Sequence, residues 1–279
     1  MLTEAIDCPT CQQSSFHPQV IKNGWNIVRC NSCSLAMVNP RRTNAVEIYQ
    51  DDAYFSDEKY YYDYCGNKKA YQKGFRTKLR LIKKYAPHGG KLLDIGAAYG
   101  FFMEESRRFD FEPFGVELSP RAAKYASQYG EVFTGTLAAF NPDIRFSVVT
   151  FIDSLEHFED PVRGLEKAYS LLVSGGIVAV MVPNIESLFA RIMGSRWHLL
   201  LPEEHLFYFS HQSVVRMLSK VGFEIVHFGT GGYGRSMEEL ARVIFRGSAD
   251  SNLRITSFLK RFSLEINLGD IFFIARKVD

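Results

Sequence analysis

The chain has 279 residues, of which 46% are hydrophobic and 23% charged, and its formal net charge is only +2. This length allows one full α/β domain with a smaller module beside it. The nearly balanced charge argues against a dedicated nucleic-acid-binding protein, which usually carries a strong basic excess. Residues 1–7 contain no apolar run, and no stretch approaches the ~20 apolar residues that cross a bilayer. We therefore expect a cytoplasmic protein without a signal peptide or stable membrane insertion.

Four of the five cysteines form two closely spaced pairs, Cys8-x2-Cys11 and Cys30-x2-Cys33. Two such pairs can supply four thiolates to one tetrahedral Zn²⁺, because each two-residue turn directs both sulfurs inward. Four unrelated cysteines would not be expected to repeat this spacing. A site with four protein ligands has no open position, so we expect a structural zinc that is remote from the reacting groups. Cys65 stands alone and is expected to be an ordinary thiol.

The sequence divides into three regions. Residues 1–40 form the predicted zinc-ribbon module, and residues 41–90 form a polar, tyrosine-rich linker. Its second half is helical in pattern, because apolar residues recur at steps of three and four from Tyr71 to Tyr85. Short apolar runs alternate with helical patterns throughout residues 91–279. This alternation predicts an α/β domain with a doubly wound, mainly parallel sheet.

Seven strands and four helices are expected in the large domain. The strands are Lys91–Ile95, Pro113–Glu117, Val132–Gly135, Ser147–Ile152, Gly176–Val182, Phe223–Phe228 and Ile271–Ala275. The helices are Phe101–Phe109, Pro120–Gln128, Asp160–Leu172 and Gln212–Val221. Two insertions, at residues 185–210 and 229–268, interrupt the pattern. The second is expected to cover the sheet as a helix, with an amphipathic lid or a membrane-surface helix as the alternatives.

A glycine turn follows the first strand of this domain, and the second strand ends at Glu117. Gly96 and Gly100 let the backbone approach a ligand closely, and an acid at the end of the next strand can accept both ribose hydroxyls. A dinucleotide site requires G-x-G-x-x-G, whose amides hold a pyrophosphate. Here the turn is Gly-x-x-x-Gly and Asp94 precedes it. A carboxylate opposes a pyrophosphate but suits the cationic amino group of a methionine moiety, so S-adenosylmethionine is favoured over a nicotinamide cofactor.

With these motifs, residues 91–228 resemble a class I S-adenosylmethionine-dependent methyltransferase of the Methyltransferase-23/11 kind. The resemblance implies a seven-stranded, Rossmann-like sheet and a role in donor binding for the following residues: Asp94, Gly96, Ala97 and Gly100 at the methionine part, Glu117 at the ribose, and Leu118, Thr136, Leu137 and Asp153 around them. Much of the family has glycine where this chain has Ala98, so we expect a slightly altered turn. The family often reads the adenine amine with an aspartate where this chain has Thr136-Leu137.

The N-terminal half carries its own resemblance. The segment from Cys30 to Pro40, followed by Tyr54-Phe55, resembles zinc-headed methyltransferases of surface-polysaccharide and natural-product pathways. Sugar C-methyltransferases also join a zinc module to this domain, and their Glu-His pair resembles Glu204-His205. Those enzymes carry a further C-terminal domain, whereas this sequence ends after the last predicted strand. We therefore expect O-methylation of a sugar, glycoconjugate or small natural product, with C-methylation of a ketosugar as the alternative.

Candidate residues for the acceptor side follow the fourth and fifth strands, where ligands bind in such sheets. The sequence from Asp153 to His157 follows strand four, and the insertion after strand five contains Glu204-His205. A hydroxyl acceptor must lose a proton as the methyl group arrives, and histidine suits that task at neutral pH. His205 is the preferred base, His157 is the second candidate, and Glu204 is expected to orient or polarise the reacting group.

Each of these residues also has a structural interpretation. His157 and Glu156 can serve packing alone, and the aromatic residues 207–209 are expected to pack under the insertion. Asp160 before Pro161 is expected to cap a helix, and Ser210 is expected to cap the last predicted helix. A zinc-ribbon binding protein with a non-catalytic Rossmann domain is the competing class, because Ala98 and Thr136 depart from the family pattern.

Overall fold

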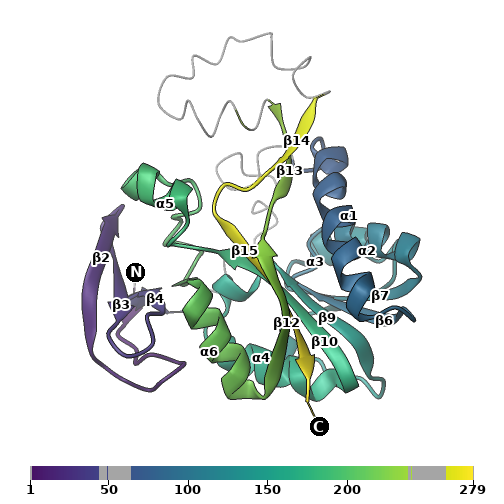
Figure 1. The fold of residues 1–279 in the computed structure, drawn as a ribbon, viewed down its shortest axis with the longest axis horizontal. Helices are drawn as coiled ribbons and strands as arrows, with labels where there is room; N and C mark the ends of the chain where they lie inside the picture. Colours follow the sequence, from purple (N-terminus) through teal and green to yellow (C-terminus); the bar gives the residue numbers. More distant parts are fainter. Residues whose placement is uncertain (1, 44–48, 50–63, 238–239, 241–261, 279) are drawn as a thin grey trace.

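The computed structural model describes residues 2–43, 49, 64–237, 240 and 262–278. Its centre is a seven-stranded sheet in the order β12-β15-β10-β9-β6-β7-β8, with helices on both faces (Figure 1). This confirms the predicted doubly wound fold. The strands are β6 (Gly90–Ile95), β7 (Phe111–Glu117), β8 (Glu131–Thr134), β9 (Phe146–Ile152), β10 (Leu172–Pro183), β12 (Phe223–Thr230) and β15 (Asp270–Lys277).

The five strands from β6 to β10 pair in parallel, and β15 runs antiparallel between β10 and β12. Successive residues of each strand face opposite sides of the sheet. Leu92 packs with helices α1 and α2, whereas Leu93 packs with α4 and α6. Both faces are therefore covered, which explains why the strands read as almost continuous apolar runs.

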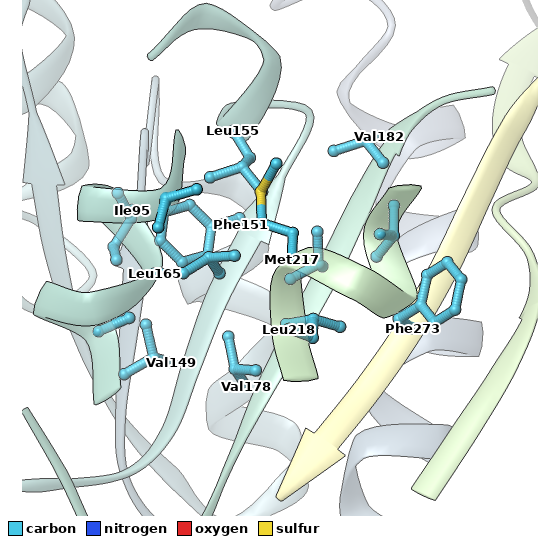
Figure 2. Packing of buried hydrophobic residues seen from close by; sticks show 14 of the residues in the cluster. Ile95, Val149, Phe151, Leu155, Leu165, Val178, Val182, Met217, Leu218 and Phe273 are labelled. Carbon is cyan, nitrogen blue, oxygen red and sulfur yellow. The ribbon is translucent and has the colours of Figure 1, made fainter. Parts of the chain in front are cut away.

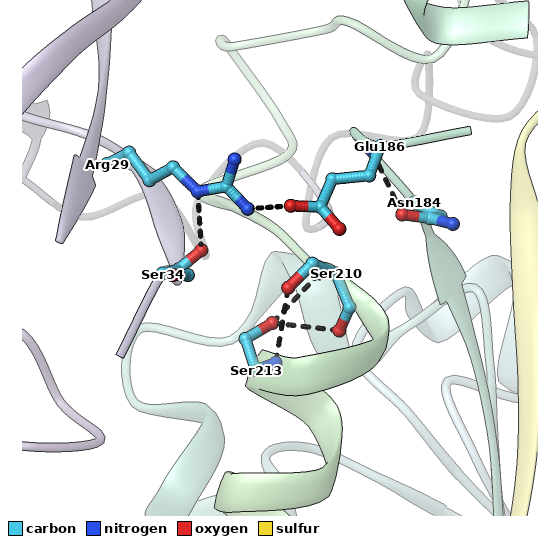
Figure 3. Close-up of polar contacts among 6 residues, drawn as sticks. All are labelled: Arg29, Ser34, Asn184, Glu186, Ser210 and Ser213. Carbon is cyan, nitrogen blue, oxygen red and sulfur yellow. Dashed lines mark hydrogen bonds and ion pairs between the residues drawn. The ribbon is translucent and has the colours of Figure 1, made fainter. Parts of the chain in front are cut away.

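The helices are α1 (Lys68–Tyr85), α2 (Phe101–Ser106), α3 (Pro120–Ala126), α4 (Pro161–Leu171), α5 (Leu188–Met193) and α6 (His211–Val221). Both predicted caps are confirmed. The Asp160 side chain accepts hydrogen bonds from two amides in the first turn of α4, and Pro161 occupies its first position. Ser210 caps α6 reciprocally with Ser213 (Figure 3). The helix expected to reach Phe109 ends earlier, because α2 tightens into a 3₁₀ turn after Ser106.

The core on one face of the sheet lies between β9, β10 and β15 and the helices α4 and α6. Figure 2 shows Phe151 and Phe273 from the sheet beside Leu165 of α4 and Met217 of α6. All four side chains are at most 1% exposed. Burying side chains of this size contributes about 1.5–3 kcal/mol each, so this face fixes the position of α4 and the loop before it.

A second, four-stranded sheet forms the N-terminal module, in the order β11-β4-β3-β2. Its strands are β2 (Phe16–Lys22), β3 (Trp25–Cys30), β4 (Ala36–Val38) and β11 (Phe207–Tyr208), and a short pair β1 (Thr3–Glu4) and β5 (Arg41–Arg42) lies beside it. The strand β11 comes from the insertion after β10 and pairs antiparallel with β4. The aromatic residues 207–209 are buried as expected. The module's sheet therefore uses residues from both parts of the chain.

Polar contacts tie the module to the large domain. Arg29 of β3 forms an ion pair with Glu186, which follows β10 (Figure 3). The Lys220 ammonium at the end of α6 donates hydrogen bonds to the carbonyls of Pro9 and Thr10, at 3.3 and 2.8 Å. The module's buried cysteines also belong to the same apolar cluster as α4 and α6. The first cysteine pair is thus anchored to the large domain.

The second insertion begins and ends as a two-stranded ribbon. Its strands β13 (Tyr233–Ser236) and β14 (Ser263–Ile266) pair antiparallel and pack beside α1 (Figure 1). The sequence between them, where we expected a covering helix or lid, lies almost wholly outside the described residues, as does Tyr54-Phe55. Among the described helices, none is long and apolar enough to cross a membrane.

Candidate active site

The turn between β6 and α2 requires glycine at two positions. Gly96 and Gly100 have φ angles of 79° and 72°, in the left-handed region that disfavours side chains. A Cβ atom on Gly96 would lie 2.7 Å from the Cβ of Ser154. One on Gly100 would lie 2.8 Å from the Cβ of Ala126. Conformation and crowding therefore both exclude larger residues, and the backbone of the turn stays accessible to a ligand.

Ala98 adopts the left-handed conformation itself, with a φ angle of 47°. Its amide donates a hydrogen bond of 2.7 Å to Oε2 of Glu117. The left-handed conformation costs a residue with a Cβ about 1–2 kcal/mol. The turn thus keeps the backbone conformation that glycine favours, and the alanine methyl group adds a steric cost without changing that conformation.

Glu117 stands at the end of β7 with both carboxylate oxygens held. Oε1 accepts from the amide of Ser119 at 2.8 Å, while Oε2 accepts from Ala98. Burial raises the pKa of Glu117, and these backbone hydrogen bonds oppose that rise. The carboxylate lines a cavity. Its fixed orientation and remaining lone pairs fit it to accept the hydroxyls of a ribose.

Asp94 lies under the turn and is 3% exposed. The Thr150 hydroxyl donates a 2.7 Å hydrogen bond to its Oδ1. Burial raises its pKa to about 7, with the nearby charge of Glu117 adding to the effect. Asp94 can therefore change its ionisation when a cationic group arrives above the turn.

One cavity of about 680 Å³ opens at the carboxyl ends of the parallel strands. This is where a doubly wound sheet binds its ligands. The predicted donor residues that line it are Gly96, Glu117, Leu118, Thr136, Leu137 and Asp153. Asp94, Ala97 and Gly100 are not among its lining residues. These three belong to the strand and the turn beside the cavity without lining it.

The two candidate bases lie one behind the other. His157 lines the cavity, and its ring contacts that of His205 edge to face, with centroids 4.8 Å apart. Nδ1 of His157 lies 2.6 Å from the Tyr49 hydroxyl and 3.1 Å from the Glu204 carbonyl oxygen. Because a carbonyl only accepts, the second contact favours a proton on Nδ1 and a lone pair on Nε2. Burial lowers the pKa of His157 to about 4.

His205 is buried and is not among the residues that line the cavity. Its Nδ1 donates to the Leu199 carbonyl oxygen at 2.8 Å, and burial lowers its pKa well below the usual range. Glu204 contacts His157 through its backbone carbonyl. The sequence ranked His205 above His157, whereas of the two only His157 lines the cavity.

The structure also brings Tyr49 to the site, which the sequence did not single out, and it buries Glu156, for which the sequence allowed a purely structural role. Tyr49 belongs to the tyrosine-rich segment, and nothing in the local pattern distinguished it from its neighbours. Glu156 is 1% exposed, and its carboxylate oxygens have no hydrogen-bond partner among the described residues. Burial and the charge of Asp153 raise the pKa of Glu156 well above its usual value. Burial thus favours the neutral form of the Glu156 carboxyl group.

The four paired cysteines converge on one point. Their sulfurs all lie within 4.8 Å of one another, with Cys8 and Cys33 at 3.3 Å and Cys11 and Cys30 at 3.4 Å. Four thiolates around a tetrahedral zinc at 2.3 Å would lie about 3.8 Å apart. The donor set and its spacing thus fit zinc. Cys65 is exposed and lies outside this cluster.

The cysteine module contributes to the same cavity as the glycine turn. The lining residues from the module are Ile6, Asp7, Pro9, Gln12 and Arg41. None of the four clustered cysteines lines the cavity, so the expectation that the zinc is remote from the reacting groups stays a prediction, but residues beside the first cysteine pair do reach the cavity. The Lys220 contact with the first cysteine pair and the β4–β11 pairing hold the module there, and neither has a local sequence signal.

The family model and curated relatives that match this chain are described as methyltransferases. A family model described as a methyltransferase domain matches residues 67–228. Among curated relatives, the ubiquinone biosynthesis O-methyltransferase of Leptothrix cholodnii is 26% identical over 156 residues, covering 50% of this chain and 66% of the relative. That of Paraburkholderia phymatum is 29% identical over 134 residues, covering 43% and 57%. The match thus spans less than two thirds of these relatives.

Solved structures share the fold at low identity. The plantazolicin methyltransferase BpumL, in complex with S-adenosylhomocysteine, has a TM-score of 0.56 at 15% identity and covers 84% of this chain and 94% of its own. The magnesium protoporphyrin IX methyltransferase of Synechocystis, also with S-adenosylhomocysteine, has a TM-score of 0.51 at 14% identity and covers 75% and 84%. These similarities confirm the predicted class I sheet.

Proposed function

Because the chain belongs to the class I S-adenosylmethionine-dependent methyltransferase family through its methyltransferase domain, we propose that it methylates a hydroxyl group of a small molecule. The observation that carries this proposal is the cavity shared by the glycine turn, Glu117 and His157. When bound, S-adenosylmethionine supplies a methyl group already activated on a sulfonium. The protein must then align the acceptor and remove its proton.

On the donor side, the backbone of the turn from Gly96 would contact the methionine part, and Glu117 would accept the ribose hydroxyls. Asp94 would stabilise the cationic amino group from below the turn. The prediction of S-adenosylmethionine over a nicotinamide cofactor rests on this carboxylate, because a pyrophosphate in the same place would meet its negative charge.

On the acceptor side, His157 would take the hydroxyl proton at Nε2. Its lowered pKa keeps it neutral at pH 7, which is the form a base requires. His205 packs against its ring and would hold it in place. The assignment of His205 as the base, which the sequence favoured, remains the competing proposal. Glu204 would orient His157 through its carbonyl.

The acceptor is proposed to be a hydroxyl of a sugar, glycoconjugate or small natural product. The curated relatives are named as O-methyltransferases, which supports an oxygen acceptor. The Glu204-His205 pair is the observation that favours C-methylation of a ketosugar. A cluster of four cysteines supports a structural zinc, held by Cys8, Cys11, Cys30 and Cys33.

Thermal unfolding in the presence of S-adenosylhomocysteine or NAD tests the proposal. We expect S-adenosylhomocysteine to raise the midpoint of unfolding and NAD to leave it unchanged, because only a ligand that binds the folded state stabilises it. Stabilisation by NAD alone would indicate an oxidoreductase. No response to either ligand would favour a zinc-ribbon binding protein whose Rossmann domain is not catalytic.

A further inference from the structure

The cavity is bounded after β8 by a segment that offers no carboxylate. The Thr136 hydroxyl accepts a hydrogen bond from the amide of Ala139 and caps the 3₁₀ turn there. Leu137 and Ala138 bring only apolar side chains to the cavity wall. Adenine carries an exocyclic amine where hypoxanthine has a carbonyl oxygen. A site that selects adenine needs a hydrogen-bond acceptor for that amine. This segment can pack against the base, but its side chains bring no charged acceptor to the amine.

The carboxylates that line the cavity are Asp7, Glu117, Asp153, Glu159 and Asp160. Three of them already have other partners. Glu117 is held by two amides and Asp160 caps α4. Asp153 receives a hydrogen bond from the Tyr233 hydroxyl, and although its Oδ1 has no partner among the described residues, it follows β9, which lies three strands from β8 in the sheet. Asp7 and Glu159 therefore remain as candidate acceptors for the amine.

Of these two, Asp7 has the better fixed backbone. It directly precedes Cys8, which is fully buried, and Lys220 holds the carbonyls of the two residues after Cys8. The Asp7 carboxylate makes no hydrogen bond or ion pair with any residue in the described parts of the chain. The backbone carbonyl of Glu159 instead accepts a 2.5 Å hydrogen bond from Arg41, which brings a guanidinium cation to that residue.

We propose that the first cysteine pair belongs to the cofactor site, and that the Asp7 carboxylate accepts the hydrogen bond of the adenine amine. This inference rests on the proposed function. The missing acceptor after β8 is thus supplied by the N-terminal module. Because the metal would order the loop that carries Asp7, metal and cofactor binding strengthen each other, and the coupling is reciprocal.

Calorimetry with two ligands tests the assignment. S-adenosylhomocysteine carries the amine, whereas S-inosylhomocysteine has a carbonyl oxygen in its place and would face the carboxylate with an acceptor. We expect the wild type to prefer S-adenosylhomocysteine by about tenfold or more, as a hydrogen bond to a charged group implies. Asp7→Ala should lose this preference with its zinc content unchanged. Glu159→Ala removes the same charge from the same cavity and should keep the preference.

A second measurement tests the coupling. Bound S-adenosylhomocysteine should slow the extraction of zinc by a chelator severalfold in the wild type and little in Asp7→Ala. An unchanged preference in Asp7→Ala, or its loss in Glu159→Ala, would overturn the assignment while leaving the methyltransferase proposal standing, provided that affinity still depends on Glu117. A wild type that binds neither ligand would instead overturn the proposed function itself.

Discussion

The amide of Ala98 donates a 2.7 Å hydrogen bond to the carboxylate of Glu117, which joins the turn after β6 to the end of β7. The two segments are neighbours in the sheet, since β6 and β7 pair in parallel. Left-handed backbone at Ala98 points its amide at the carboxylate. The orientation of the proposed ribose acceptor thus depends on a strained residue, and this relationship can be tested from both sides.

Replacing Ala98 by glycine should stabilise the protein. Glycine adopts the left-handed conformation without the steric cost that alanine meets, although its greater freedom in the unfolded chain offsets part of the gain. We expect Ala98→Gly to raise the free energy of unfolding by about 0.5–1 kcal/mol in urea titrations. Ala97→Gly is the matched control, because Ala97 is buried and not left-handed. It should destabilise the protein, and equal effects would refute the strain argument.

Removing the Glu117 side chain should weaken donor binding. Glu117→Ala is expected to reduce the affinity for S-adenosylhomocysteine by about 1–3 kcal/mol, as when hydrogen bonds to a charged group are lost. Glu112 lies on the same strand but is exposed, and Glu112→Ala should bind normally. Calorimetry on both variants decides the point. Unchanged affinity in Glu117→Ala would place the ribose elsewhere.

The raised pKa of Asp94 predicts how stability and binding depend on pH. Between pH 3.8 and about 7 the folded state holds a proton that the unfolded state has released, so this group's contribution to stability falls as pH rises. The Asp94→Asn variant should therefore gain stability relative to wild type from pH 5 to pH 8. Affinity for S-adenosylhomocysteine should increase over pH 6–8 in the wild type, because the ionised carboxylate attracts its ammonium group. A flat binding profile in the wild type would contradict this role.

Local signals were sufficient to predict much of the fold and the glycine turn. The glycine turn, Asp160 before Pro161 and Ser210 each act within a few residues, and the structure has them as predicted. The pairing of β11 with β4 has no such signal, because a two-residue strand carries no periodicity and its partner is far along the chain. The same long-range pairing brings the cysteine module to the cavity. Sequence patterns therefore predicted the glycine turn but not the contribution of the cysteine module to the cavity lining.

The cysteine cluster predicts one zinc per chain. Cys30→Ser should abolish stoichiometric zinc in elemental analysis and lower the free energy of unfolding by several kcal/mol, since metal binding and folding of such a module are coupled. Cys65→Ser is the control, because Cys65 is exposed and outside the cluster. Retention of a full equivalent of zinc by Cys30→Ser would show that the metal, if any, has other ligands.

The same substitution at His157 and at His205 should have different effects on the rate. A positioned base contributes about 10²–10⁴-fold to the rate. His157→Gln should therefore lower kcat by that factor in single-turnover assays while donor affinity stays intact. His205→Gln should have a smaller effect, because His205 contacts the ring of His157 and does not line the cavity. His88 is exposed, and His88→Gln should behave as the wild type.

The pH profile separates this role from a merely structural one. A base is active when it has lost its proton, and the pKa of His157 is lowered to about 4 by burial. At saturating donor, kcat should therefore stay level from pH 8 to about pH 5.5 and fall only as pH approaches 4, whereas with an ordinary histidine kcat would fall below about pH 6.5. If His205→Gln is inactive and His157→Gln turns over normally, the base is His205, as the sequence suggested. If both turn over normally, alignment of the acceptor alone accounts for the transfer.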